Sequence, residues 1–261
     1  MTLTHPDTRP SEQATDDLDS AWTRLPAAQA AVLAALARRR RAAVATALAA
    51  FASEVKAFHQ ATDRAVRDFA LRTVPERYEA AARAAAASIN RPFTWTPAHR
   101  ATLNALTADT YTDLTLRIQE AVRAAAAFHR AARAAARRRL TPTSAAELAA
   151  AHPLDRIVYR NGARMPVRAW AEAATLARTT VAYNTGTLAV AREHGIQHVE
   201  VHDGSDCGWT SHPDPDKAAR TLRTVEDAAQ WPIAHPRCTR TFGLRPDGKS
   251  PIGRVPPLVA G

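Results

Sequence analysis

Apolar or small side chains recur at alternating three- and four-residue steps along two long stretches of this chain. The first stretch consists of Val44, Leu48, Phe51, Val55, Phe58, Thr62, Ala65 and Phe69. The second stretch consists of Tyr111, Leu114, Ile118, Ala121, Ala125, Phe128, Ala132 and Ala135. This heptad spacing places these side chains on one face of a helix, which favours lengthwise packing against another helix. The two stretches therefore predict long helices that form an antiparallel hairpin or stalk.

Prolines and capping residues predict where the helices begin and end. Pro26 is expected to interrupt a first helix that begins near residues 18–22. The tripeptide Thr73-Val74-Pro75 is expected to end that helix, because proline cannot donate a helical hydrogen bond. Thr96-Pro97 suits the N-cap and first position of the longest helix. The further helices predicted in this way cover about 76–88, 97–139, 145–151 and 166–194.

Beyond residue 153, turn residues and alternating polarity predict short strands. Asn161-Gly162 separates two β-prone segments, and this dipeptide is a strong signal for a tight hairpin turn. Gly195 is expected to end the preceding helix, because glycine readily adopts the left-handed conformation of a C-cap. His198 to His202 then alternates as a strand does, with its valines on one face. The remaining predicted elements are strands over 221–225 and through Thr241-Phe242, and a helical turn over 225–230.

These patterns predict a mainly α fold with a small α+β C-terminal module. The long heptad-bearing helices form a stalk or hairpin, and a compact module that contains cysteines and histidines follows them. The expected domains are a disordered acidic arm (1–17), a long-helix region (18–152), the C-terminal module (153–245) and a flexible tail (246–261).

The formal net charge of the 261-residue chain is +10, and this charge is unevenly placed. Residues 1–23 carry one arginine and five acids, a net charge of −4. Residues 24–140 carry 20 basic and 8 acidic residues, a net charge of +12. Two arginine clusters there are candidates for binding phosphate or an acidic protein surface, and a solvated basic helix face is the simpler alternative. The candidates are Arg38, Arg39, Arg40, Arg41, Arg137, Arg138 and Arg139.

Several classes of protein are not expected from the sequence. There is no run of about 18 apolar residues, so no transmembrane helix is predicted. The N-terminal stretch lacks the features of a secretory signal, and two cysteines are too few for a disulfide scaffold. An intracellular, reducing environment is therefore expected. No nucleotide-binding loop, nucleophile elbow or zinc-protease motif occurs, so neither catalytic nor cofactor-binding residues are predicted.

The segment from His198 to Phe242 holds both cysteines of the chain and the strongest candidate chemistry. Cys207 and His212 form one close pair, His235 and Cys238 form a second, and 22 residues separate the pairs. Two short loops that each offer two such ligands are a common way to bind structural zinc. A Cys207–Cys238 disulfide and two packed, unlinked cysteines are the alternatives.

Two enzymatic interpretations of this segment also stay open. Cys238 near His235 has the composition of a thiol nucleophile and its base. The group formed by His202, Asp203, Asp206 and His212 has the composition of a metal-dependent nuclease site.

Asn184 lies on the apolar stripe of the helix predicted over 166–194. A buried amide needs hydrogen-bond partners. Asn184 therefore fixes the register of the helix, bonds to the backbone of the following module, or is exposed on a rotated helix.

About a third of the chain, residues 157–245, resembles a family of phage proteins. The residues that carry this resemblance are Tyr159 to Trp170 (YRNGARMPVRAW), Ala177-Arg178-Thr179, Asn184, Gly195, Val199-x-Val201, Asp206-Cys207 and His235-Pro236-x-Cys238. Together they resemble the minor capsid and head morphogenesis proteins of tailed bacteriophages, of the Mu F-like kind. Many relatives carry a second cysteine soon after the first, where this chain has Gly208 to Ser211. Either His212 replaces that ligand or the metal site is absent.

The resemblance implies a low-copy structural protein inside the phage head, and no enzyme. Such proteins associate with the portal, join the procapsid in the host cytoplasm, and affect the packaging or ejection of DNA. Capsid and portal proteins are therefore the expected partners, with packaged double-stranded DNA as a further one and no membrane. The alternatives are a metal- or thiol-dependent enzyme that processes nucleic acid and a basic helical DNA-binding protein.

Overall fold

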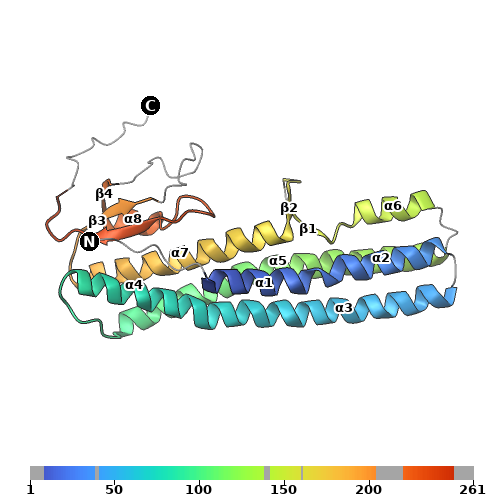
Figure 1. Ribbon diagram of the computed structural model, residues 1–261, viewed down its shortest axis with the longest axis horizontal. Coiled ribbons are helices and arrows are strands. Elements are labelled where there is room, and N and C mark those ends of the chain that lie inside the picture. Colours follow the sequence, from blue (N-terminus) through green and yellow to red (C-terminus); the bar gives the residue numbers. More distant parts are fainter. Residues whose placement is uncertain (1–8, 39–40, 138–141, 160, 204–219, 250–261) are drawn as a thin grey trace, which may run out of the picture. The chain divides into compact units, whose positions relative to one another are not determined.

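The computed structural model describes residues 9–38, 41–137, 142–159, 161–203 and 220–249, which are mainly helical. The helices are α1 (Arg9–Trp22), α2 (Arg24–Ala37), α3 (Arg41–Asp68), the π-helix η1 (Phe69–Thr73), α4 (Val74–Ser88), α5 (Pro97–Arg137), α6 (Pro142–Ala151), α7 (Val167–Glu193) and α8 (Val225–Gln230) (Figure 1). The strands are β1 (Arg156–Val158), β2 (Arg164–Pro166), β3 (His198–His202), β4 (Leu222–Thr224) and β5 (Thr241–Leu244). The predicted fold class, mainly α with a small sheet near the C-terminus, is confirmed.

The described residues group into two compact units, and each unit draws on separate parts of the chain. Unit 1 contains those within 1–11, 69–110 and 173–261, and unit 2 contains those within 12–68 and 111–172. The boundaries fall inside α1, α5 and α7 and at the junction of α3 with η1. This grouping differs from the predicted succession of a helical region and a C-terminal module, because α5 and α7 each contribute to both units.

Helix α1 corrects the prediction of a disordered arm over residues 1–17. The helix begins at Arg9, so a large part of the predicted arm is ordered. Its buried side chains follow helical spacing, and they are Ser11, Ala14, Thr15, Leu18, Ala21 and Trp22. Most of them are small, and four acids lie among them along the chain, which hides the amphipathic pattern in the sequence.

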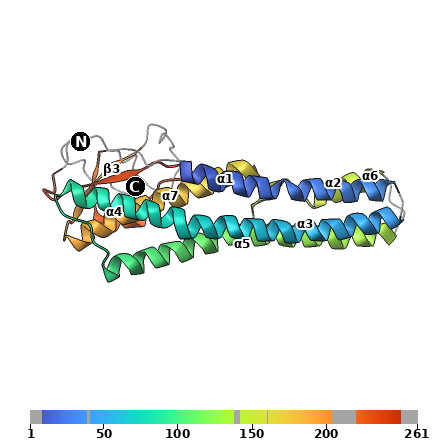
Figure 2. The ribbon, with the colours of Figure 1, turned by 60° about the horizontal axis from the view of Figure 1, so that its bottom comes forward.

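Helices α2 and α3 form a hairpin in unit 2, and the helix interruption expected at Pro26 occurs three residues earlier, at Thr23 between α1 and α2. This proline lies in the first turn of α2, where a missing backbone N–H costs little. The chain is not helical at Arg38. The two helices α2 and α3 therefore replace the single helix that was predicted between Pro26 and η1. Their antiparallel alignment follows from an ion pair between Arg24, at the start of α2, and Glu54, within α3. Figures 1 and 2 show the two helices side by side.

The predicted helix break at Thr73-Val74-Pro75 is instead a π-helical turn, and the chain stays helical from Arg41 to Ser88. A proline ring crowds the carbonyl of the residue four positions earlier, and widening the preceding turn relieves that clash. One row of buried side chains runs through this turn at steps of four residues. These side chains are Thr62, Val66, Ala70, Val74, Tyr78, Ala82 and Ala86.

The long helices α3 and α5 run antiparallel within unit 2. The ring of Phe51 packs edge-on against Phe128, with 5.1 Å between ring centroids. Further along, the hydroxyl of Tyr111 donates a 2.6 Å hydrogen bond to Asp63. The contacts thus pair increasing residue numbers on α3 with decreasing residue numbers on α5, which is the antiparallel arrangement of the predicted hairpin. At the start of α5, the N-cap role of Thr96 is confirmed by a hydrogen bond that its hydroxyl accepts from the backbone of His99.

A short hairpin and a tryptophan-centred cluster lie in unit 2. Strands β1 and β2 pair antiparallel, and Gly162 between them has a φ of +80°, so the hairpin predicted at Asn161-Gly162 is confirmed. The indole of Trp22 donates to the carbonyl of Leu154 at 3.2 Å. The same indole packs against Phe58 and Trp170, with 5.0 and 5.7 Å between ring centroids.

The C-terminal sheet packs on α7 in unit 1. Its strand order is β4-β3-β5, with both pairs antiparallel. The predicted C-cap is confirmed at Gly195, which has a φ of +64°. The backbone N–H of Ile196 then donates to the carbonyl of Ala191. The core between helix and sheet consists of Leu188, Ala191, Ile196, Val199, Val201, Val225, Ala228 and Phe242.

Among the described helices, none is long and apolar enough to cross a bilayer.

Candidate functional site

The predicted zinc ligands fall partly within the described residues. Cys207 and His212 lie outside them, as does Asp206. Cys238 is a buried free thiol, and its backbone N–H donates to the carbonyl of His235 at 2.9 Å. Within the described ranges, no three His, Cys, Asp or Glu residues lie close enough together to hold a metal ion. Zinc binding by this module therefore stays a prediction.

A buried hydrogen-bond network holds the segment around Cys238 against α7. The side-chain amide of Asn184 is fully buried and donates to the carbonyls of Pro232 and Arg240, at 2.6 and 2.8 Å. This geometry confirms one of the three predicted roles, a bond from the helix to the backbone of the following module. Since its partners lie on both sides of the His235-Pro236-x-Cys238 motif, Asn184 fixes the position of that motif relative to α7.

The same network contains a buried ion pair. The guanidinium of Arg240 is fully buried and donates to both carboxylate oxygens of Asp203, at 2.6 and 3.3 Å. It also donates to the carbonyl of Trp231 at 3.4 Å. Burial of two charges is tolerated only when they are paired and hydrogen-bonded in this way. Asp203 is one of the residues considered for a nuclease site. Its carboxylate is already paired with the guanidinium of Arg240.

A second buried network, in unit 1, links helices α4, α5 and α7. The ring of His99 is 2% exposed, with Nδ1 2.7 Å from the hydroxyl of Tyr78 and Nε2 2.9 Å from a carboxylate oxygen of Glu193. When Glu193 is ionised, Nε2–H donates to it and Nδ1 accepts from Tyr78. Burial, and then the charge of Glu193, raise the pKa of Tyr78 to about 12. Both rings are buried, so the network holds the three helices together.

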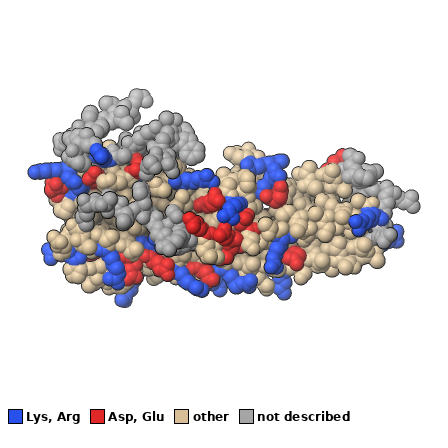
Figure 3. All heavy atoms as spheres, viewed as in Figure 1, with Lys and Arg blue, Asp and Glu red and all other residues tan. Residues whose placement is uncertain are grey.

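Arginines of the two predicted clusters are exposed at one end of unit 2. Arg38, Arg41 and Arg137 are exposed, whereas the other four members lie outside the described residues. Because α3 and α5 are antiparallel, the first residue of α3 and the last of α5 lie at the same end. Figure 3 shows basic side chains at the end where α2 and α3 meet. Phosphate binding by these arginines stays a prediction.

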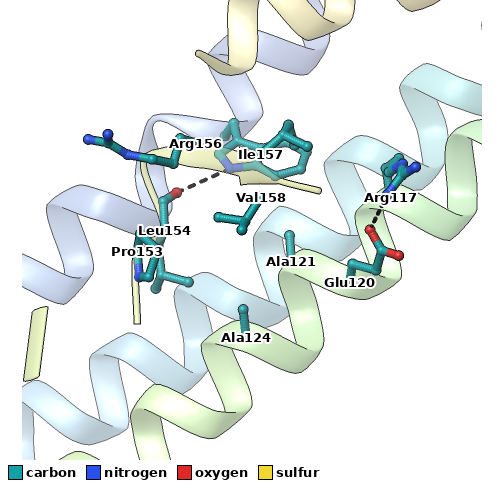
Figure 4. Close-up of a pocket in the computed structure, with 10 residues that line it drawn as sticks. Arg117, Glu120, Ala121, Ala124, Pro153, Leu154, Arg156, Ile157 and Val158 are labelled. Carbon is teal, nitrogen blue, oxygen red and sulfur yellow. Dashed lines mark hydrogen bonds and ion pairs between the residues drawn. The ribbon is translucent and has the colours of Figure 1, made fainter. Parts of the chain in front are cut away.

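A pocket of about 80 Å³ lies between α5 and β1 in unit 2 (Figure 4). Its floor is apolar and includes Ala121, Leu154 and Ile157. At the rim, Arg117 donates to Glu120 at 2.8 Å and lies over the ring of Tyr159. The described lining contains no serine, cysteine or histidine. Most of the lining is apolar, so the pocket suits an apolar group.

Sequence reasoning missed Arg240, Asp203 as its partner, and the network around His99. An arginine between two threonines carries no signal of burial, because arginine is mostly exposed in proteins. His99 has only one local signal, its position three residues after an N-cap threonine. Its partners Tyr78 and Glu193 lie 21 and 94 residues away, so spacing along the chain does not connect them.

Comparison of the chain with models of protein families, with curated proteins and with solved structures found no match.

Proposed function

We propose that this chain is a structural minor capsid or head morphogenesis protein of a tailed bacteriophage, associated with the portal inside the procapsid. The observation that carries the proposal is the ordered set of motifs between Tyr159 and Cys238. The bonds of Asn184 support it, because they connect the helix of this set to the segment around His235-Pro236-x-Cys238. Two parts of the motif set that are distant in sequence are thus joined by hydrogen bonds.

In this proposal the heptad-bearing helices α3 and α5 form a stalk that contacts the portal. The protein then resides in the virion, after assembly in the host cytoplasm. Mass spectrometry of purified virions and procapsids tests this directly, with particles from a deletion strain as the control. We expect the chain at low copy number, and we expect it to co-purify with the portal protein of the same phage. Absence from both kinds of particle would overturn the proposal.

Contact with packaged DNA is the second part of the proposal, and the exposed Arg38, Arg41 and Arg137 support it. Titration of a fluorescent DNA duplex at several salt concentrations tests it. Replacing Arg38 and Arg41 by glutamate removes two cations, so the slope of log affinity against log salt should decrease by about 2. Arg64→Glu, at an exposed position 23 residues along α3, is the matched control and should leave most of that slope. Equal effects of the two variants would contradict a specific DNA contact.

Structural zinc at Cys207, His212, His235 and Cys238 is the third part of the proposal. Metal analysis of the purified chain should find about one zinc per chain, and the Cys238→Ser variant should lose zinc and stability together. A nuclease assay on the same samples separates this role from the enzymatic alternative. We expect no DNA cleavage by either sample. Metal-dependent cleavage that disappears in Cys238→Ser would favour the enzyme.

A further inference from the structure

Helices α2 and α3 together form an open groove on unit 2, with a volume of about 300 Å³. Each helix contributes four residues at positions i, i+3, i+4 and i+7, which places them in one row along the helix. The row on α2 consists of Arg24, Ala27, Ala28 and Ala31, and the row on α3 consists of Ala47, Ala50, Phe51 and Glu54. Five of these eight residues are alanines, and Phe51 is buried below them.

The groove is free of charge except at one end. The sequence has no charged residue between Arg24 and Arg38, or between Arg41 and Glu54. Alanines on both helices, including Ala27, Ala31 and Ala50, are nevertheless exposed to solvent. A wide helical face without charges is unusual for a surface in water, where helices carry polar side chains on their outer side. Small side chains also allow another helix to approach closely.

The single charged end contains one residue of each sign, one on either side of the groove. The side chains of Arg24 and Glu54 are 57% and 42% exposed, and their charged atoms are 3.9 Å apart. At this distance and exposure the pair contributes little to stability within one chain. Each charge therefore stays available to a second partner of opposite sign.

These charges make the surface complementary to itself. A two-fold axis that runs along the groove places α2 of one copy against α3 of the other. Residues at the same height along the groove then face each other in the two copies. Arg24 of each copy then faces Glu54 of the other copy, and alanine rows face alanine rows. A different helical partner would have to supply both charges at matching positions, whereas a second copy supplies them by symmetry.

We propose that this groove is the interface of a homodimer with two-fold symmetry. A hairpin face ~21 Å long and ~20 Å wide covers ~420 Å² per copy. A standard stable interface buries about 800 Å² per partner, so the dimer is weak and depends on concentration. This inference does not depend on the proposed role in a phage head.

Sedimentation velocity of the full chain over a concentration series tests the dimer. We expect a mass that rises from 28.2 kDa toward twice that value as the concentration increases. Ala31→Glu places a charge in the centre of the interface and should raise the dissociation constant at least about tenfold. Ala52→Glu is the matched control, because this exposed alanine lies five residues after Ala47 and thus ~140° around α3.

A charge exchange provides a second test that does not alter packing. Arg24→Glu alone should weaken the dimer, because two like charges then face each other in each half of the interface. Adding Glu54→Arg should restore it, and circular dichroism should show the same helix content in all variants. A monomer at every concentration, equal effects of Ala31→Glu and Ala52→Glu, or failure of the double exchange to restore the dimer would each overturn the proposal.

Discussion

The side chain of Asn184 shows what a single residue reveals before the structure is known. Its place on an apolar stripe allowed three roles, and one of them was a bond to the backbone of the following module, which the structure shows. The partners themselves, the carbonyls of Pro232 and Arg240, lie 48 and 56 residues further on. They are backbone groups, which every residue possesses, so no side-chain pattern could have identified them.

Replacing Asn184 by leucine should destabilise the chain by about 1–3 kcal/mol. The substitution keeps the volume of the side chain approximately, but it leaves two carbonyls without their donor. The free energy of unfolding from urea titrations measures the effect. Gln197→Leu is the matched control, because this exposed amide also donates to a carbonyl, that of Gly195, at 3.2 Å. Equal losses in the two variants would contradict a special role for the buried amide.

Gly186→Ala should also destabilise unit 1, although alanine normally favours a helix over glycine by about 1 kcal/mol. A methyl group at Gly186 would lie well inside van der Waals contact of the backbone oxygen of Tyr78. Backbone cannot rotate out of the way as a side chain can, so overpacking of about 1–3 kcal/mol outweighs the helix preference. Thermal unfolding measures the outcome. Gly195→Ala serves for comparison, because it meets no atom within 4 Å and is limited by its positive φ alone.

Because the pKa of the Tyr78 hydroxyl is raised, we expect the stability of the fold to decrease at high pH. Its pKa is raised to about 12 in the folded chain, chiefly by burial, whereas an unfolded tyrosine titrates near pH 10. The contribution of this difference is complete below about pH 10, and it is lost as the pH rises to about 12. Tyr78→Phe removes this part of the slope, so the stabilities of wild type and variant should converge over that window. Parallel curves from urea titrations at each pH would contradict the prediction.

At the scale of elements, predictability depended on the size of the buried side chains. The positions of α5, α7 and the short hairpin followed from large apolar residues, capping residues and an Asn-Gly turn. The first part of α1, before Leu18, was missed because its buried face uses serine, alanine and threonine, which also suit disordered segments. The π-turn η1 was missed because a proline inside a helical pattern normally indicates the end of a helix.

Leu18→Ala should show that α1 is an integral part of the fold. Leu18 is 1% exposed, and truncation of a buried leucine costs about 2–5 kcal/mol. Leu71→Ala is the matched control, because Leu71 is 61% exposed and its loss should change stability by less than about 0.5 kcal/mol. Urea titrations of both variants provide the comparison. A frayed or disordered α1 would make the two substitutions equally harmless.

At the scale of the whole chain, the two units should unfold together. Helices α5 and α7 run through the boundaries between the units, and helix formation is cooperative. Far-UV circular dichroism follows the helices, and fluorescence follows tryptophans of both units, including Trp22 in unit 2 and Trp95 in unit 1. We expect the same midpoint from both signals in a urea titration. Two separate transitions would show that the helices do not transmit cooperativity.

The candidate site was less predictable than the fold. The motif around Cys238 could be found because the chain has only two cysteines, and one of them lies three residues after His235. The groove between α2 and α3 could not be found, since alanine is common throughout the helices and carries no specific signal. Its recognition required the pairing of two rows that are 23 residues apart in the sequence.

The bonds of Asn184 also bear on the order of events during synthesis. Arg240 is added 56 residues after Asn184, which takes roughly 3–11 s on the ribosome. Throughout that interval, α7 carries an amide on its apolar side without the carbonyls that satisfy it. The helix reaches its final packing only when the segment before β5 arrives. A chain interrupted before that point would lack these bonds and keep the apolar side of α7 uncovered there, and chaperones and proteases act on such incompletely folded chains.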